Sequence, residues 1–220
     1  MAITTAMLTS FKSDLLSGLH CFNQSRTFTA SGTSGQFTLT SVSSLTGLAV
    51  GNSVTGTNIA AGAVIASIDS STQITLSKAH TGTVGPAATC TTVGDTFKIA
   101  LIKIGMAGTY GAASTNYTDI TGNSDEVTGT GYTAGGATLT NVDPTTSGTT
   151  AFTDFSPDPS WTSASFSTAG CMIYNATRNG PVATRGCSVH DFGGTQTVSS
   201  GTFTAVMPTP DASNAILRIG

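Results

Sequence analysis

The sequence has little charge. Lys, Arg, Asp and Glu make up 9% of its 220 residues, whereas about 25% is usual for a globular domain. So few acids and bases leave little material for acid–base catalysis, for holding a metal ion or for gripping phosphate. Net charge also opposes association, so a chain this poor in charge is badly equipped to stay a lone soluble monomer. The composition therefore indicates a protein that is packed against copies of itself or against partners.

Basic residues are scarce, and long apolar runs are missing. Eight Lys and Arg residues are scattered along a chain of net charge −3, whereas proteins that bind duplex nucleic acid concentrate such residues to displace counterions. No apolar run approaches the ~20 residues of a membrane span. The first ten residues lack the basic and apolar regions of a signal peptide. We therefore expect no nucleic-acid partner, no membrane partner and synthesis in a cytoplasm.

Cysteine pairs of the CxxC kind are also absent. The four cysteines are far apart in the sequence, at Cys21, Cys90, Cys171 and Cys187. In a protein folded in a reducing cytoplasm, isolated cysteines are usually buried thiols rather than disulfides or zinc ligands. The sequence predicts four thiols that are at least partly buried.

The N-terminal residues show the one clear helical pattern. Apolar residues recur at spacings of three and four, as Leu8, Phe11, Leu15 and Leu19, with Met7 and Leu16 flanking this stripe. Thr4 or Thr5 is expected to cap the start of this helix, and Gly18 lies near its expected end. An amphipathic helix has to bury its apolar stripe. The burying surface is either the chain's own β-core or a neighbouring subunit.

From residue 27 onward the pattern changes to period two, which is typical of strands. Strands are predicted at 36–42, 64–68, 73–76, 96–104, 126–129, 137–142, 150–155, 161–166, 170–174, 183–191, 202–207 and 215–219. In the strongest of these, Phe97, Ile99 and Leu101 are expected to face one way, and Lys98 and Ala100 the other. Many short strands joined by Gly-, Ser- and Asn-rich turns predict an all-β protein with an antiparallel sandwich or jelly-roll-like body.

Residues 27–94 differ from the rest. They are dominated by Gly, Ala, Thr and Ser, and Asp69 and Lys78 are their only charged residues. We interpret this stretch as a small β-module inserted after the helix, because insertions are tolerated at surface positions. The main body is then built from residues 1–26 together with residues 95–220.

Residues able to do chemistry occur only in weak combinations. Cys187 and His190 are three apart on a predicted strand and so would face opposite sides of it. His20 and Cys21 are adjacent and are no better placed to share an ion. Zinc would also need two further ligands. We therefore predict no metal site and no cofactor.

Two pairs of carboxylates could flank a sugar, as the catalytic acids of glycosidases do. Asp125 and Glu126 form one pair, and Asp154 and Asp158 form the other. Both lie in turn-rich segments, where Asp usually caps a turn. No GxSxG nucleophile motif is present, so we predict that the protein is not an enzyme.

Two loops and three tyrosines complete the candidate sites. The glycine-rich run at 129–136 does not match the GxGxxG pattern and is better suited to tight turning or to close approach of another backbone. The loop at 119–125 does not match a calcium-binding loop and is expected to be solvated. A carbohydrate-binding module would need an exposed aromatic platform, and the candidate residues for it are Tyr110, Tyr117 and Tyr132.

Several strings in the sequence resemble a group of tailed-bacteriophage virion proteins. They are MAITTAMLTSFK at 1–12, DTFKIAL at 95–101, EVTGTGYTAGGATL at 126–139, MIYN at 172–175, DFGG at 191–194 and DASNAILRI at 211–219. In that group the helix runs almost directly into the TFKIAL strand. Relative to it, about seventy residues are inserted here.

The resemblance implies a virion structural protein that is made in the cytoplasm of the host bacterium. A capsid decoration or cement protein is the first expectation; a tail or fibre component, or a carbohydrate-binding module, is the alternative. The implied partners are the major capsid protein or other virion proteins and copies of this chain. No catalytic residue carries over from the group. We expect the subunit contacts at the helix and the C-terminal segment, namely at Met7, Leu8, Phe11, Leu15, Leu19, Ile216 and Ile219.

Overall fold

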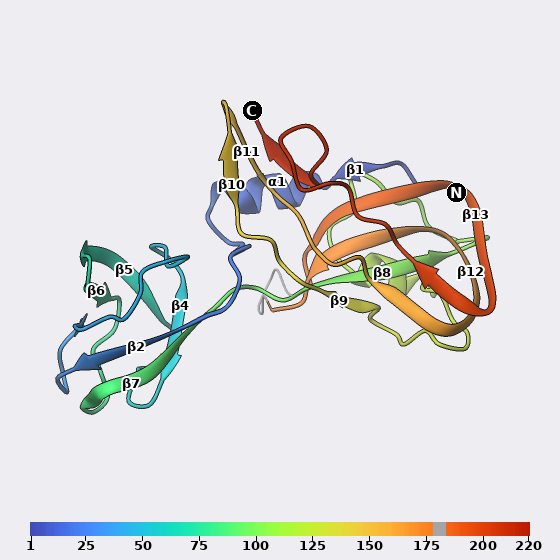
Figure 1. Cartoon of the computed structure of the whole chain (residues 1–220). Helices are drawn as coiled ribbons and strands as arrows, with labels where there is room; N and C mark the ends of the chain where they lie inside the picture. Colours follow the sequence, from blue (N-terminus) through green and yellow to red (C-terminus); the bar gives the residue numbers. More distant parts are fainter. Residues whose placement is uncertain (178–183) are drawn as a thin grey trace. The chain divides into compact units, whose positions relative to one another are not determined.

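The structure is a computed structural model that describes residues 1–177 and 184–220. Its strands form antiparallel sheets, with two short helices among the described residues (Figure 1). The predicted all-β antiparallel class is confirmed. The chain divides into two compact units, here called the body (Met1–His20 with Asp95–Gly220) and the module (Cys21–Gly94). The module thus begins at residue 21, whereas the sequence suggested residue 27.

The body contains a five-stranded sheet and a three-stranded sheet. The order in the first is β1 (Ala6–Met7), β13 (Gly186–Thr204), β12 (Ser160–Asn175), β8 (Phe97–Lys103) and β9 (Ala137–Leu139). The order in the second is β10 (Thr145–Ser147), β11 (Thr150–Thr153) and β14 (Leu217–Ile219). The helices are α1 (Thr9–Leu16) and α2 (Thr118–Gly122).

Strand β8 is buried on both faces. Phe97, Ile99 and Leu101 are fully buried, as the alternating pattern predicted, but Ala100 and Ile102 on the opposite face are fully buried as well. Within the sheet the strand lies between β12 and β9. A strand whose two faces are both buried favours a nearly continuous apolar sequence. The alternating pattern predicted the strand correctly. The burial of both of its faces explains the unbroken apolar run from residue 99 to 102.

The helix α1 is shorter than the apolar stripe suggested. Residues 6 and 7 pair with β13 as strand β1, so the helix starts at Thr9, and its N-cap is Leu8 without a side-chain cap. The expected capping by Thr4 or Thr5 is therefore wrong. The expected end is confirmed: Gly18 has a φ of 66°, and the amide of Leu19 donates to the Asp14 carbonyl at 3.0 Å, as in a Schellman motif.

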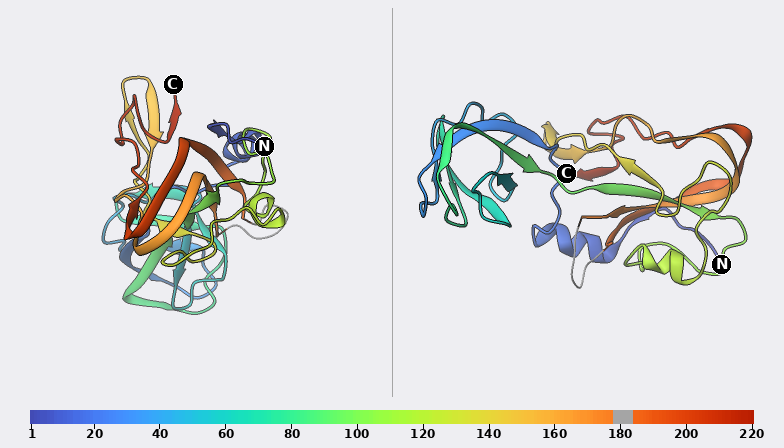
Figure 2. Two further views of the ribbon diagram at one scale, coloured as in Figure 1. Left: turned by 90° about the vertical axis from the view of Figure 1, so that its right-hand side faces the viewer. Right: turned by 90° about the horizontal axis from the view of Figure 1, so that it is seen from below.

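Strands β12 and β13 form one long, curved hairpin (Figures 1 and 2). The sequence predicted two separate strands in each of its arms, and this was wrong. Bulges keep the two strands paired where the alternation of apolar and polar residues breaks. One bulge lies between Thr168 and Gly170, and opposite it Gly193 and Gly194 have positive φ angles. Bulges bend a strand without ending it. Residue 183, where one predicted strand began, lies outside the described residues.

The module is a six-stranded sheet. Its order is β2 (Arg26–Gly32), β7 (Val84–Val93), β4 (Ser53–Gly56), β5 (Ala63–Ser70), β6 (Gln73–Leu76) and β3 (Thr38–Leu39). Its core consists of small and branched apolar side chains with a single aromatic, Phe28. The predicted strand at 36–42 shrinks to β3, with Leu39 buried and Phe37 48% exposed. Strands β2, β4 and β7 escaped prediction because Thr, Ala and Gly fill positions that larger residues usually mark.

Candidate functional site

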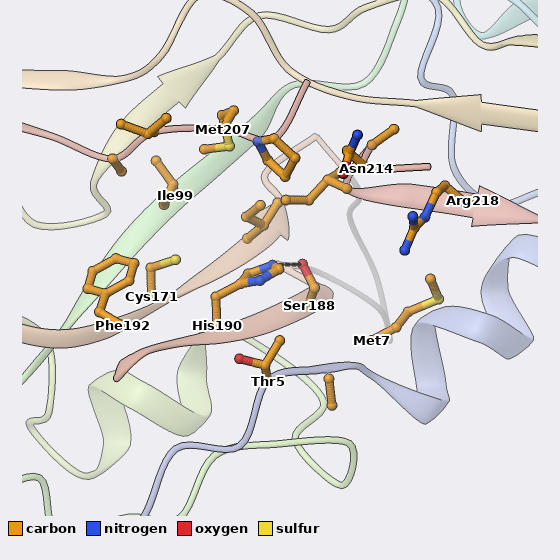
Figure 3. Close-up of a pocket in the computed structure, with 17 residues that line it drawn as sticks. Thr5, Met7, Ile99, Cys171, Ser188, His190, Phe192, Met207, Asn214 and Arg218 are labelled. Carbon is orange, nitrogen blue, oxygen red and sulfur yellow. Dashed lines mark hydrogen bonds between the residues drawn. The ribbon is translucent and has the colours of Figure 1, made fainter. Parts of the chain in front are cut away.

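A recess of about 510 Å³ lies between the five-stranded sheet and the C-terminal segment of the body (Figure 3). Most of its lining is apolar, and two of the predicted contact residues, Met7 and Ile216, belong to it. Among the described residues that line it, Arg218 is the only one of the Lys, Arg, Asp and Glu types. The recess therefore suits apolar groups, within the size range of ordinary ligand pockets.

His190 and Ser188 lie side by side on the wall of this recess (Figure 3). The Nε2 atom of His190 is 2.9 Å from the Ser188 hydroxyl oxygen. Burial lowers the pKa of His190, which favours the neutral ring. Cys187 is buried and does not line the recess, as strand alternation predicted. Within the described chain, no three His, Cys, Asp or Glu residues gather closely enough to hold a metal ion.

Asp125 is a buried carboxylate held by several donors. It accepts hydrogen bonds from the amides of Ala107 (2.8 Å) and Gly108 (2.7 Å) and from the Tyr110 hydroxyl (2.6 Å). The Lys103 ammonium lies 3.4 Å away. Burial pushes the pKa of Asp125 upward, but the hydrogen bonds outweigh it and the pKa is lowered. The expectation of a solvated loop at 119–125 holds for residues 121–124, which are exposed. It is wrong for Ile120 and Asp125, which are buried, and the Asp125 carboxylate organises the loop from inside.

Glu126 is held in a similar way by tyrosines. Its carboxylate accepts hydrogen bonds from the hydroxyls of Tyr117 and Tyr132, the second at 2.7 Å, and from the amide of Gly135 at 2.7 Å. The ring of Tyr117 stacks on that of Tyr174 with centroids 4.5 Å apart. These oxygens are engaged in holding a loop against the sheet, so the pair Asp125 and Glu126 is not open to a substrate.

The three candidate platform tyrosines do not form an exposed surface. Tyr110 is 1% exposed. Tyr117 and Tyr132 are half-buried, and the ring of Tyr132 lies 6.0 Å from Trp161 and 5.9 Å from Phe166. The hypothesis of a three-tyrosine carbohydrate platform is therefore wrong.

The glycine-rich run at 129–136 brings backbones together, as predicted. A Cβ at Gly136 would lie 1.8 Å from the carbonyl oxygen of Ile99, and one at Gly129 would lie 2.5 Å from that of Ser165. Contacts of this kind leave no room for a side chain, so glycine is required here. The predicted strand at 126–129 is reduced to an isolated bridge between Glu126 and Ile102.

The predicted helix contacts divide into two groups. Leu8 and Phe11 are 0% and 2% exposed and belong to the body's own core. Leu15 is half-buried, and Leu19 is 37% exposed. The most exposed apolar residue of the helix is Leu16, at 93%, which the sequence placed only at the flank of the stripe. Near the C-terminus of the chain, Ile219 is 63% exposed.

A polar network that the sequence did not reveal fixes the end of α1. The Asp14 carboxylate lies 2.6 Å from Nε of Arg185 and 3.6 Å from Nε2 of His20. The Asn175 amide donates to Nδ1 of His20 (2.9 Å) and to the carboxylate of Asp95 (2.6 Å). These residues are spread over most of the chain, so only the fold brings them together.

Comparisons with models of known protein families, with curated proteins and with solved structures found no match. No helix within the described ranges is long and apolar enough to cross a membrane. The body and the module are therefore characterised by their own geometry, as antiparallel all-β units.

Proposed function

We propose that the chain is a non-enzymatic structural protein of a tailed-phage virion, and that it serves as a capsid decoration or cement protein. The observation that carries this proposal is where the segments with the phage-like sequences lie. Residues 97–101 are in β8, 172–175 are in β12, and 211–219 include β14. All of these segments belong to the body, and none to the module. The body is thus the unit to which the resemblance applies, and the module is an addition to it.

The state of the polar side chains supports a role without catalysis. The carboxylates of Asp125 and Glu126 are engaged by tyrosine hydroxyls and backbone amides. Asp154 is fully buried and accepts a hydrogen bond from the amide of Ile216 at 3.0 Å, which fixes the C-terminal segment. The acids that could have flanked a substrate serve instead to hold loops in place.

The surface of the body supports a role in assembly. Large apolar side chains are exposed on it, among them Leu16, Leu19, Ile104, Val206 and Ile219. Burying one Leu or Ile side chain at an interface contributes ~2 kcal/mol. Contacts that are weak one at a time stabilise a shell when they are repeated over many copies, and apolar contacts bury no unpaired ions.

The experiment that tests the proposal is a count of copies in purified particles by quantitative mass spectrometry. A decoration protein is expected at copy numbers on the order of hundreds, as set by the symmetry of the head. A few dozen copies or fewer would identify a tail or fibre component. Absence of the protein from purified particles would overturn the virion assignment altogether.

We expect substitution of Leu16 or Ile219 by lysine to weaken attachment. Both side chains are exposed, so Leu16→Lys and Ile219→Lys should leave the melting temperature unchanged. Loss of ~2 kcal/mol of apolar burial corresponds to about thirtyfold weaker binding to particles that lack the protein. Co-sedimentation with such particles measures this.

The matched control is Val50→Lys, because Val50 is 63% exposed on the module. Binding by both body variants at the level of the unsubstituted protein would contradict contacts at Leu16 and Ile219. Deletion of residues 1–20 is a poorer test, since it also removes Leu8 and Phe11 from the core.

A further inference from the structure

The outer edge of β13 has no partner strand beyond its first residues. One side of β13 pairs with β12 along the whole hairpin. On its other side, β1 pairs only with Ser188 and Val189, and the Asp191 amide donates to the Thr5 hydroxyl. Among the described residues, no other segment pairs with positions 192–204 on that side. A row of backbone donors and acceptors is thus left exposed.

The other arm of the same hairpin is covered. The Ser165 amide on β12 donates to the Thr130 carbonyl at 2.9 Å, and Gly131 lies tightly against the strand there. The remaining strands at the edges of the body's sheets are short, because β9, β10 and β14 have three residues each. Among the body's described strands, β13 therefore has the one long exposed edge.

This edge also lacks the residues that normally protect an edge. Natural sheets place Lys, Pro or inward-pointing charges on exposed edges to prevent pairing with another chain. No charged residue occurs between Asp191 and Asp211, and the first proline after β13 begins is Pro208. The positive φ angles of Gly193, Gly194 and Ser200 limit the regular part of the edge to residues 195–199.

We propose that residues 195–199 of β13 pair antiparallel with the same residues of a second copy. The β12–β13 hairpins of the two chains would then form one continuous sheet across a two-fold axis. Centred on Thr197, this pairing places Thr195 of one chain opposite Ser199 of the other. This inference rests on the proposed function, which requires copies of the chain to be joined. It deepens that function by naming the strand that joins them.

The chemistry of the edge favours a second copy over a different partner. A strand edge recognises another strand edge through backbone hydrogen bonds, and a two-fold interface requires a surface that complements itself. An uncharged edge meets its own copy without repulsion. Cross-strand hydroxyl pairs are stabilising, and the hairpin already contains one, with Ser167 and Thr197 hydroxyl oxygens 2.8 Å apart.

The test is a pair of charge variants on these exposed positions. The variants are Thr195→Lys with Ser199→Lys, and Thr195→Glu with Ser199→Glu. Light scattering coupled to size exclusion, at about 100 μM so that a micromolar contact is populated, is expected to give twice 22.0 kDa for the unsubstituted chain. Each variant alone is expected to be monomeric because like charges face each other. An equimolar mixture is expected to restore the dimer mass.

The matched control is Thr145→Lys with Ser147→Lys on β10, which is exposed and equally uncharged but only three residues long. It is expected to remain dimeric. A monomeric unsubstituted chain, or Lys and Glu variants that stay dimeric alone, would overturn the inference. If the protein is present in particles but monomeric in solution, the edge pairing is overturned and the proposed function is not. If the protein is a dimer in solution but absent from particles, the proposed function is overturned and the edge pairing is not.

Discussion

Alanine in place of Gly136 is expected to cost the body at least ~3 kcal/mol of unfolding free energy. Two effects add. Gly136 has a φ of 69°, where a side chain costs about 1 kcal/mol. In addition, its Cβ would lie 1.8 Å from the Ile99 carbonyl oxygen and 2.9 Å from the Cα of Ala100. Both atoms belong to the central strand β8, which cannot shift without disturbing its pairing with β9 and β12. Urea unfolding monitored by tryptophan fluorescence measures the loss, because Trp161 lies in the body.

Gly148→Ala separates the two effects. Gly148 has a φ of 58°, and a Cβ there would meet nothing within 4 Å, so only the conformational cost of about 1 kcal/mol is expected. Equal losses for the two variants would show that the loop at 129–136 is not held against the sheet as described. A larger loss for Gly136→Ala is the expected result.

This glycine run shows what the sequence could predict. The spacing of Gly129, Gly131 and Gly136 excluded a phosphate loop and indicated close backbone approach, because glycine without a helix following it has few other uses. The identity of the approached strand could not be predicted. That depends on β12 and β8 lying under the loop, which is a matter of long-range pairing.

The polar interactions were harder to predict from the sequence than the strands. Period-two alternation located β8 and the C-terminal strand β14, since burial leaves its pattern in neighbouring residues. The ion pair between Asp14 and Arg185 leaves no such pattern, because its partners are separated by nearly the whole body. For the same reason Asp125 was expected in a solvated loop: in the sequence, nothing distinguishes a carboxylate that caps a turn from one that is enclosed by it.

Asn in place of Asp125 is expected to lower the unfolding free energy by ~3 kcal/mol at neutral pH. The carboxylate uses both oxygens to accept from Ala107, Gly108 and Tyr110. A carboxamide offers one oxygen and turns an NH₂ group toward one of these donors. The pairing with Lys103 is lost as well. Removing one partner from a buried, charge-assisted network typically costs 3–5 kcal/mol, about what is expected here.

The pH dependence of this loss distinguishes the charge from simple packing. Because the fold lowers the pKa of Asp125 below 3.8, its contribution is complete above that value and disappears as the pH falls through the folded-state pKa. Denaturant unfolding of both proteins at pH 7 and near pH 2.5 should therefore show a gap that narrows on acidification. Asp191→Asn, at an exposed position on β13, should show little loss at either pH. A gap for Asp125→Asn that stays constant across this range would mean that shape alone holds the loop. A narrowing gap would mean that the negative charge of Asp125 holds the loop.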